Sequence, residues 1–232
     1  MENENLKIAR SKSLNNLHQE KNRYKNSISL KNFIINKLFI NSFFYKKLLN
    51  LVGIKVGINI KFLGPINFIL NGNIKNIILG DDLLIHKNVT LKIRENGKII
   101  ISNKVVLDEN VRLVAAREGA IEIGEGTNIG ANTIINSGGK IRIGKYCLIS
   151  NNCNINSSSH GTSIKNYIID QSHNHGEIII ENDVWLGGFV TISMNSYLKE
   201  GAIVGANSFV NSILSEFSIN VGCPAKIIGY RE

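Results

Sequence analysis

Three of the five histidines of the chain, His160, His173 and His175, lie close together in the sequence. An imidazole is largely neutral near pH 7, so it can accept the proton of a hydroxyl group and turn that oxygen into a nucleophile. Three imidazoles could instead bind a zinc ion. These residues therefore indicate either proton transfer or a metal site, and the elements that position them decide between the two.

The histidines interrupt a repeat in which an aliphatic residue returns at every sixth position. A helix repeats near 3.6 residues and a strand near 2, so neither element alone explains this period. Three hexapeptides make one coil, and successive coils stack as parallel strands about 4.8 Å apart. The pattern predicts an all-β solenoid. Its inward column comprises Leu79, Ile85, Leu91, Ile101, Leu107, Leu113, Ile123, Ile129, Ile135, Ile143, Ile149, Ile155, Ile180, Leu186, Ile192, Leu198, Val204 and Val210.

A second column, four residues after the first or second aliphatic position of each coil, holds mostly small side chains. Such side chains fit where the walls of a narrow prism converge. Cys147 and Cys153 occupy this column, so we expect both thiols to be core groups. A total of three cysteines, an odd number, agrees with a reducing compartment. The column reads Leu83, Val89, Val105, Val111, Thr127, Thr133, Cys147, Cys153, Val184, Val190, Ala202 and Ser208.

The interruptions of the repeat all follow the third hexapeptide of a coil, so the extra residues must line one edge of the prism. The first three are short and predict a low wall along that edge, whereas the fourth predicts a long extruded loop. Insertions on one face of a solenoid usually mark its binding face. The interruptions are residues 92–100, 114–122, 136–142 and 156–179.

Residues 123–128 and 143–148 are clear copies of a hexapeptide pattern, aliphatic-Gly-x-x-small-x. Over residues 79–231 the chain resembles the hexapeptide-repeat acyltransferases, and among them the sugar and polysaccharide O-acetyltransferases. The resemblance implies a left-handed parallel β-helix. The left hand comes from the resemblance alone, because the general rule for parallel crossovers would give the right hand.

The resemblance also implies a role for one histidine. In the resembling O-acetyltransferases the catalytic histidine follows the third hexapeptide at the start of the extruded loop, which is the place of His160. We therefore expect His160 to act as general base, with Ser159 and Asn156 in the wall of the site. Family members often carry an acidic residue just before this histidine, where this chain has serines 157–159. Glu177 or a backbone carbonyl is then expected to orient the ring.

Residues 182–188 resemble the Asn-Val-Trp-Ile-Gly coil of the family and contain Trp185, the only tryptophan of the chain. Trp185 precedes an inward aliphatic residue, so its side chain should point outward. There it would pack on a neighbouring subunit, wall the active site, or do both. Glycines in register with the repeat would let the pantetheine arm of coenzyme A lie against the backbone at Gly187, Gly188, Gly205 and Ala206.

The closing stretch, residues 220–231, resembles the Gly-x-Pro-Ala-Lys-x-Ile end of the family. Lys226 and Arg231 are candidate partners for the phosphates of coenzyme A, because cationic donors are the expected partners of phosphate. The alternative for both is an ordinary solvated surface charge.

Taken as a whole, the resemblance implies an acetyl-coenzyme A dependent O-acetyltransferase that needs no metal. Such an enzyme would move an acetyl group directly to a sugar hydroxyl of a cell-surface glycan of capsule, lipopolysaccharide or sialic-acid type. It would act as a homotrimer with its sites between subunits. Two alternatives stay open, a metalloenzyme like the γ-type carbonic anhydrases and a non-catalytic trimeric scaffold.

The N-terminal part of the chain is basic, because residues 1–60 contain 11 Lys and Arg against 3 Asp and Glu, a charge of +8 out of a total of +9. We expect a segment 1–52, with an amphipathic helix over about residues 28–52, followed by the solenoid at 53–232. The helix either packs on the first coils or a partner, or lies on the anionic surface of the inner membrane. The polar first residues lack the pattern of a signal peptide and indicate the cytoplasm. Nucleic acid is not an expected partner, since the solenoid shows no basic face with aromatic platforms.

Overall fold

The computed structural model describes residues 42–47, 49–51, 53–64, 66–165 and 167–232. They belong to a compact unit that begins at Asn41. Most of the basic segment, and most of the helix predicted for residues 28–52, therefore lie outside the described residues. Residues 42–47 and 49–51 are helical.

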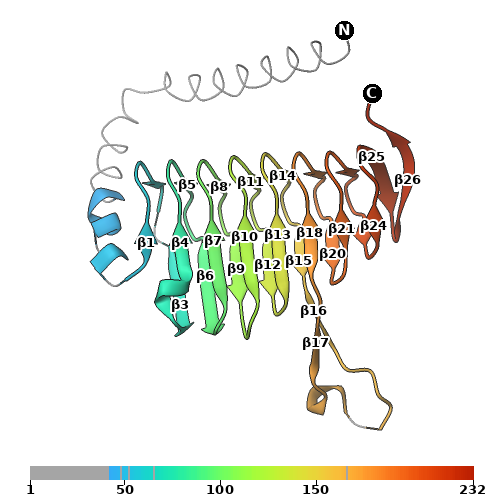
Figure 1. Ribbon diagram of the computed structural model, residues 1–232, viewed down its shortest axis with the longest axis horizontal. Helices are drawn as coiled ribbons and strands as arrows, with labels where there is room; N and C mark the ends of the chain where they lie inside the picture. Colours follow the sequence, from blue (N-terminus) through green and yellow to red (C-terminus); the bar gives the residue numbers. More distant parts are fainter. Residues whose placement is uncertain (1–41, 48, 52, 65, 166) are drawn as a thin grey trace. The chain divides into compact units, whose positions relative to one another are not determined.

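From residue 53 onward the chain forms a parallel β-solenoid with three sheets along its sides, here called sheets A, B and C (Figure 1). Neighbouring strands within a sheet come from successive coils and run parallel. Each full coil contributes one strand to sheet A, then one to sheet B, then one to sheet C.

Sheet A contains β1 Lys55–Val56, β4 Ile77–Leu79, β7 Lys98–Ile101, β10 Ala120–Ile123, β13 Lys140–Ile143, β18 Ile178–Ile180, β21 Tyr197–Leu198 and β24 Ile213–Leu214. Sheet B contains β2 Lys61–Phe62, β5 Leu84–Ile85, β8 Val106–Leu107, β11 Asn128–Ile129, β14 Leu148–Ile149, β19 Trp185–Leu186, β22 Ile203–Val204, β25 Ser218–Gly222 and β26 Ala225–Tyr230. Sheet C contains β3 Asn67–Gly72, β6 Thr90–Glu95, β9 Arg112–Ala115, β12 Ile134–Ser137, β15 Asn154–Asn156, β20 Thr191–Ser193 and β23 Phe209–Val210. A short 3-10 helix, η1 Ile74–Asn76, precedes β4.

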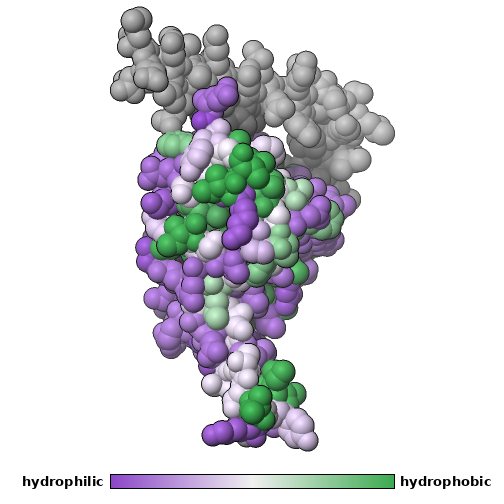
Figure 2. Space-filling model, turned by 90° about the vertical axis from the view of Figure 1, so that its right-hand side faces the viewer, coloured by the Kyte–Doolittle hydropathy of each residue, from purple (hydrophilic) through white to green (hydrophobic). Residues whose placement is uncertain are grey.

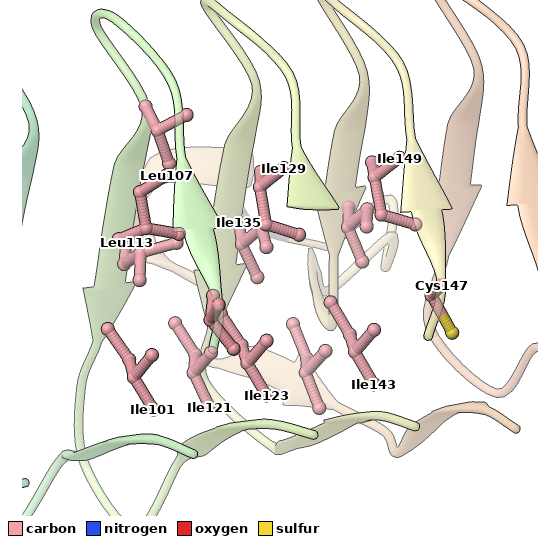
Figure 3. Packing of buried hydrophobic residues seen from close by; sticks show 14 of the residues in the cluster. Ile101, Leu107, Leu113, Ile121, Ile123, Ile129, Ile135, Ile143, Cys147 and Ile149 are labelled. Carbon is pink, nitrogen blue, oxygen red and sulfur yellow. The ribbon is translucent and has the colours of Figure 1, made fainter. Parts of the chain in front are cut away.

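Stacking of equivalent positions fills the inside of the prism with aliphatic side chains (Figure 3). Ile101, Ile123 and Ile143 lie in register on adjacent strands. Each of the eighteen aliphatic side chains predicted to point inward is at most 3% exposed. A single coil has no interior of its own, so these side chains are buried only by the coils on either side. The parallel β-helix predicted from the six-residue period is confirmed.

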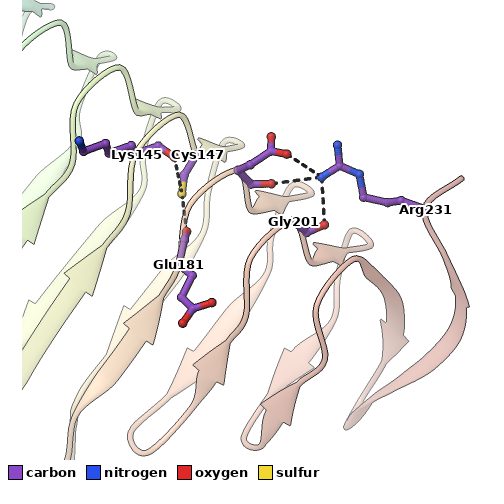
Figure 4. A network of polar contacts seen from close by, with 6 residues as sticks. Lys145, Cys147, Glu181, Gly201 and Arg231 are labelled. Atoms are coloured by element: carbon purple, nitrogen blue, oxygen red, sulfur yellow. Dashed lines mark hydrogen bonds and ion pairs between the residues drawn. The ribbon is translucent and has the colours of Figure 1, made fainter. Parts of the chain in front are cut away.

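The column of small side chains is buried as well. Thr127 in this column satisfies its hydroxyl by donating to the carbonyl of Gly144 at 2.7 Å. Cys147 and Cys153 lie in the core, and Sγ of Cys147 is 3.0 Å from the carbonyl oxygen of Glu181 (Figure 4). Burial raises the pKa of the Cys147 thiol to about 11 and also raises the pKa of Cys153. The core position predicted for both cysteines is confirmed.

The short insertions extend the coils at the edge where sheet C passes into sheet A. Strands β6, β9 and β12 run on past the prism before the chain turns back into β7, β10 and β13. The inward alternation continues along this extension, where Ile93, Ala115 and Ser137 are all 0% exposed. The predicted low wall is therefore present, and it continues the core of the solenoid.

The long insertion leaves from the same edge as an antiparallel β-ribbon, here called the ribbon. Strand β16 (Ser158–His160) follows β15 and pairs with β17 (His173–His175), after which the chain returns to β18. A 3-10 helix, η2 Ile168–Asp170, lies between the two strands. Figure 1 shows the ribbon projecting beyond the coils. The ribbon lies within residues 156–179, where an extruded loop was expected, and its strand pairing was not predicted.

The helical residues before the solenoid pack on its first coils. The hydroxyl of Ser42 donates to the carbonyl of Phe62 at 2.9 Å and accepts the N–H of Phe62 at 3.1 Å. Leu49 is 4% exposed, and the ring of Tyr45 lies edge-on to Phe62 with centroids 5.2 Å apart. These residues therefore contact the first coils, and they lie in the compact unit that begins at Asn41. No helix in the described ranges is long and apolar enough to cross a membrane.

The last strand closes the stack by reversing direction, since β26 pairs antiparallel with β25. Arg231 ties this end to earlier coils. Its Nη1 donates to Oδ2 of Asp183 at 2.9 Å and to the carbonyl of Gly201 at 3.1 Å (Figure 4). The guanidinium also lies over the ring of Phe217, 5.9 Å from its centroid.

The burial of two thiols predicts their reactivity. Native protein treated with a disulfide reagent at pH 8 should modify one thiol per chain quickly, because Cys223 is exposed whereas Cys147 and Cys153 are buried with raised pKa values. Denatured protein should titrate all three. The Cys223→Ser variant should show no fast reaction, and rapid modification of a second thiol in the native protein would contradict the packed interior.

Candidate functional site

His160 lies at the outer end of β16, on one face of the ribbon. The pairing of β16 with β17 sets His160 opposite His173 and Ser158 opposite His175. The rings of His160 and His173 have centroids 4.1 Å apart at an interplanar angle of 45°. His173 and His175 stack nearly parallel with centroids 6.0 Å apart. The three histidines singled out in the sequence therefore form one row of imidazoles.

The base of the ribbon is held against the preceding turn of the wall. Oγ of Ser158 lies 3.1 Å from Nδ1 of His175. Both side chains lie over Gly138, where a Cβ atom would overlap Nδ1 of His175 and Oγ of Ser158. Oγ of Ser157, fully buried, accepts the N–H of Gly138 at 3.1 Å. The glycine lets the ribbon stand close to the wall, and these contacts fix its direction.

The two other residues predicted for the wall of the site have different places. Oδ1 of Asn156 accepts the N–H of Ser158 at 3.1 Å, so Asn156 shapes the start of the ribbon. Ser159 lies between Ser158 and His160 on an extended strand, and alternation points its side chain to the opposite face from His160. The structure therefore brings Asn156 to the root of the histidine row and turns Ser159 away from it.

The surroundings of the row are basic. The pKa of His173 is lowered, first by loss of hydration and then by the neighbouring positive charges of His160, Arg117, His175 and Arg94. Arg94 comes from the end of β6 and Arg117 from the turn between β9 and β10. His173 therefore stays neutral to a lower pH than an ordinary histidine.

One of the two groups expected to orient His160, Glu177, has another partner. Glu177 forms an ion pair with Arg142 at 2.9 Å, at the start of the return to sheet A. No carboxylate contacts the ring of His160 among the residues that the structure describes. Its ring contact is the imidazole of His173. Nor does the described part of the chain hold a group of three His, Cys, Asp or Glu residues arranged to bind a metal ion.

A second candidate feature is a groove of about 600 Å³ at the corner where sheet B passes into sheet C. It is open to solvent and mixes polar and apolar side chains. Trp185 lies near it on sheet B, paired with Leu148. Its side chain is 46% exposed, in agreement with the predicted outward direction. The lining includes Asp108, Asn128, Leu148, Asn151, Gly188 and Phe189.

Of the residues predicted to approach coenzyme A, Gly188 lines this groove. Gly187 instead packs against the backbone of Gly205 and Ala206 in the next coil, so stacking of the coils explains why it is a glycine. Gly205 packs in turn against Val221. Gly188 therefore lies at the groove, and Ala206 is exposed one coil later.

The two basic candidates at the chain end differ. Lys226 is exposed on β26. Arg231 already bonds to Asp183 and Gly201, so a role in phosphate binding would require it to leave those partners. The groove and the ribbon also lie on different edges of the prism, because the groove follows sheet B and the ribbon follows sheet C. One chain alone does not bring Gly188 to His160.

Phe189 is a groove residue that the sequence reasoning missed. The corner between sheets B and C has a residue with positive φ in nearly every coil, and apart from Phe189 these residues are asparagines. Phe189 takes φ +61° there, although left-handed backbone costs a residue with a Cβ atom about 1–2 kcal/mol and asparagine tolerates it best. A break in a column of asparagines is a signal visible in the sequence. The column is Asn88, Asn110, Asn132, Asn152, Phe189 and Asn207.

Two aromatic residues with positive φ at the corner between sheets A and B have a packing role that Phe189 lacks. Tyr146, with φ +58°, covers Gly126 of the preceding coil, and Phe217, with φ +55°, covers Gly201. The corner residue before Phe189 is Asn152, and the ring of Phe189 is 60% exposed over the groove. The ring of Phe189 therefore covers no glycine of the preceding coil, and such packing does not compensate for its strained backbone.

The chain is similar to proteins that are named acetyltransferases. No protein-family model matches the chain. Over 157 residues it is 27% identical to a probable acetyltransferase of Mycobacterium tuberculosis, a match that covers 67% of this chain and 50% of that protein. It is 29% identical over 144 residues to the putative lipopolysaccharide biosynthesis O-acetyl transferase WbbJ of Escherichia coli, covering 59% and 74%. The match thus spans half the length of the mycobacterial relative.

Solved structures show the same fold. The polySia specific acetyltransferase NeuO superposes with a TM-score of 0.56 at 22% identity, covering 77% of this chain and 87% of that one. A hexapeptide-repeat acetyltransferase of Vibrio cholerae, VCA0836, complexed with acetyl-coenzyme A, gives a TM-score of 0.52 at 25% identity, covering 58% and 72%. The resemblance to hexapeptide-repeat acyltransferases inferred from the sequence is confirmed. The names of the relatives agree with the enzyme class expected from the sequence, an acetyltransferase.

Replacing Phe189 by asparagine should stabilise the protein, because asparagine fits the left-handed corner. We expect the free energy of unfolding to rise by about 1 kcal/mol and Tm by roughly 2–4 °C, measured by thermal unfolding. Asn152→Ala, one coil earlier at the same corner, should lower Tm as the matched control. A lower Tm for Phe189→Asn would contradict the reading that this ring is exposed and its backbone strained.

Proposed function

We propose that the chain is an acetyl-coenzyme A dependent O-acetyltransferase whose acceptor is a sugar hydroxyl of a cell-surface glycan. The observation that carries the proposal is the position of His160. Its side chain is exposed on the ribbon, at the edge of the solenoid where the short insertions also lie. Proteins similar to this chain are named acetyltransferases. The acceptor class is supported by the glycan-related names of WbbJ and NeuO. Capsule, lipopolysaccharide and sialic-acid glycans are the candidates.

His160 is the proton acceptor in this proposal. The acceptor hydroxyl gives its proton to a ring nitrogen of His160 while its oxygen attacks the thioester carbonyl of acetyl-coenzyme A. The tetrahedral intermediate collapses as the C–S bond breaks, which leaves an acetyl ester on the sugar. The proton then passes from His160 to the coenzyme A thiolate. Assistance by a general base is typically worth about 10² to 10⁴ in rate, and backbone N–H groups would stabilise the oxyanion.

Transfer is direct, without an acetyl group on the enzyme. A covalent route through cysteine would need an exposed thiolate. Cys147 and Cys153 are both sealed in the core with raised pKa values, and Cys223 lies in the turn between β25 and β26, outside the ribbon and the groove. Coenzyme A would lie along the groove at Gly188, with Lys226 as the available partner for its phosphates.

The proposal includes a homotrimer with each site formed between two subunits. The ribbon and the groove leave different edges of one prism, so a second subunit is needed to bring Gly188 to His160. The far end of the ribbon exposes apolar side chains, seen in Figure 2 as green atoms at its tip beside purple ones. Exposed apolar side chains at the end of a projecting arm are typical of a subunit contact. Those at the tip, each at least 63% exposed, are Ile164, Tyr167, Ile168 and Ile169.

We place the enzyme in the cytoplasm, with peripheral contact to the inner membrane through its basic N-terminal segment. The support is the charge of +8 carried by residues 1–60. Anionic lipid surfaces attract such segments with about 1 kcal/mol per Lys or Arg, and the attraction falls with salt.

The His160→Ala variant should lose acetyl transfer. Because the side chain is exposed on the ribbon, the variant should keep the oligomeric state and Tm of the wild type, while release of coenzyme A thiol in the presence of acceptor falls by about 10² to 10⁴. Asn174→Ala, on the opposite face of the same ribbon, is the matched control and should remain active. Undiminished turnover in His160→Ala would refute the mechanism.

Deleting residues 1–40 tests the membrane contact and leaves the compact unit from Asn41 intact. The full chain should sediment with vesicles that contain anionic phosphatidylserine and should be released at high salt, whereas the shortened chain should stay in the supernatant. Neutral vesicles serve as the control. Equal binding by both chains would rule out the N-terminal segment as the contact.

A further inference from the structure

We propose that His173 is the positioning residue of the site, which packs against the ring of His160 and leaves it free to take up the acceptor's proton. This inference rests on the proposed function of His160 and adds a second residue to it. In this arrangement the imidazole of His173 orients the ring of His160, a task for which the sequence suggested an acidic residue or a backbone carbonyl.

The geometry comes from the ribbon itself. Cross-strand neighbours on one face of an antiparallel pair are close enough for side-chain contact, and His160 and His173 are such a pair. Their centroids lie 4.1 Å apart, so the two rings are in contact. The ring of His160 would otherwise turn freely about its side-chain bonds, since it is exposed at the end of β16.

His173 is itself held on its far side. The ring of His175 stacks on it with an interplanar angle of 7°, and His175 is fixed at Nδ1 by Oγ of Ser158. Ser158 and His175 rest on Gly138 of the wall. A chain of contacts therefore runs from the solenoid through His175 and His173 to His160, and it restricts where the base can point.

The charge state of His173 suits this role. The groups that face it are Arg94 on β6, Arg117 in the turn between β9 and β10, His160 on β16 and His175 on β17, all basic. Loss of hydration and the charges that these neighbours carry when protonated lower the pKa of His173, which favours its neutral form. A neutral ring beside His160 does not oppose the proton that His160 must accept, whereas a charged one would.

Two variants of the full chain separate ring contact from charge. His173→Ala removes the contact, and kcat for thiol release should fall by about 10-fold to 100-fold with the KM for acetyl-coenzyme A little changed. His173→Phe restores a ring that carries no charge, so kcat should return close to the wild-type value. Asn174→Ala on the opposite face should match the wild type in both constants.

A third variant tests the charge. His173→Lys puts a fixed cation beside His160 and disfavours its protonated form. The pH below which activity is lost should therefore move down by about one unit. Proton NMR of the imidazole signals should show the same downward shift in the titration of His160, assigned by its absence in His160→Ala.

The outcomes separate this inference from the proposed function. A wild-type protein that never releases thiol from acetyl-coenzyme A would refute the proposed function, while the NMR titration would still test the pair. A wild-type kcat in His173→Ala, or an equal loss in His173→Phe and His173→Ala with unchanged Tm, would overturn the role of the His173 ring. An unmoved His160 titration in His173→Lys would overturn its electrostatic part.

Discussion

The structure depends on the stacking of aliphatic side chains from one coil onto the next. A column such as Ile101, Ile123 and Ile143 excludes water only while the hexapeptides of successive coils stay in register. Insertion of one residue within a strand would shift every later side chain of that strand to the other face of its sheet, because the side-chain period of a strand is two. Additions are therefore confined to corners. The one long addition then has to project outward, and that requirement places His160 beyond the wall.

The coils of the solenoid could be predicted from the sequence, but only part of the candidate site could. The period of six was enough to predict the inward columns, the burial of Cys147 and the outward direction of Trp185, because each follows from a count of residues along a strand. The position of the ribbon was predictable for the same reason. Pairing within it was not, since Ser158 and His175 are brought together by a turn whose residues carry no repeat.

Two residues singled out in the sequence have structural partners that the sequence does not show. Gly187 looks like a ligand-binding glycine, yet the next coil already explains it. Glu177 looked available to His160, but Arg142 binds it. In both cases the sequence shows the chemistry of the residue but not which neighbours contact it. Phe189 is the opposite case, since its significance appears only once its φ of +61° is known beside a column of asparagines.

The reversal of the chain at β26 has a consequence for how copies of this protein meet. A solenoid that ended on a parallel strand would offer its last coil as a template, on which the first coil of another copy could continue the ladder into a fibre. Here β26 covers the edge of sheet B and runs against the direction of every coil before it. Arg231, bound to Asp183 two coils back along sheet B, holds that cover in place. Continuation of the parallel ladder is therefore opposed at sheet B, whereas sheets A and C still end on the parallel strands β24 and β23.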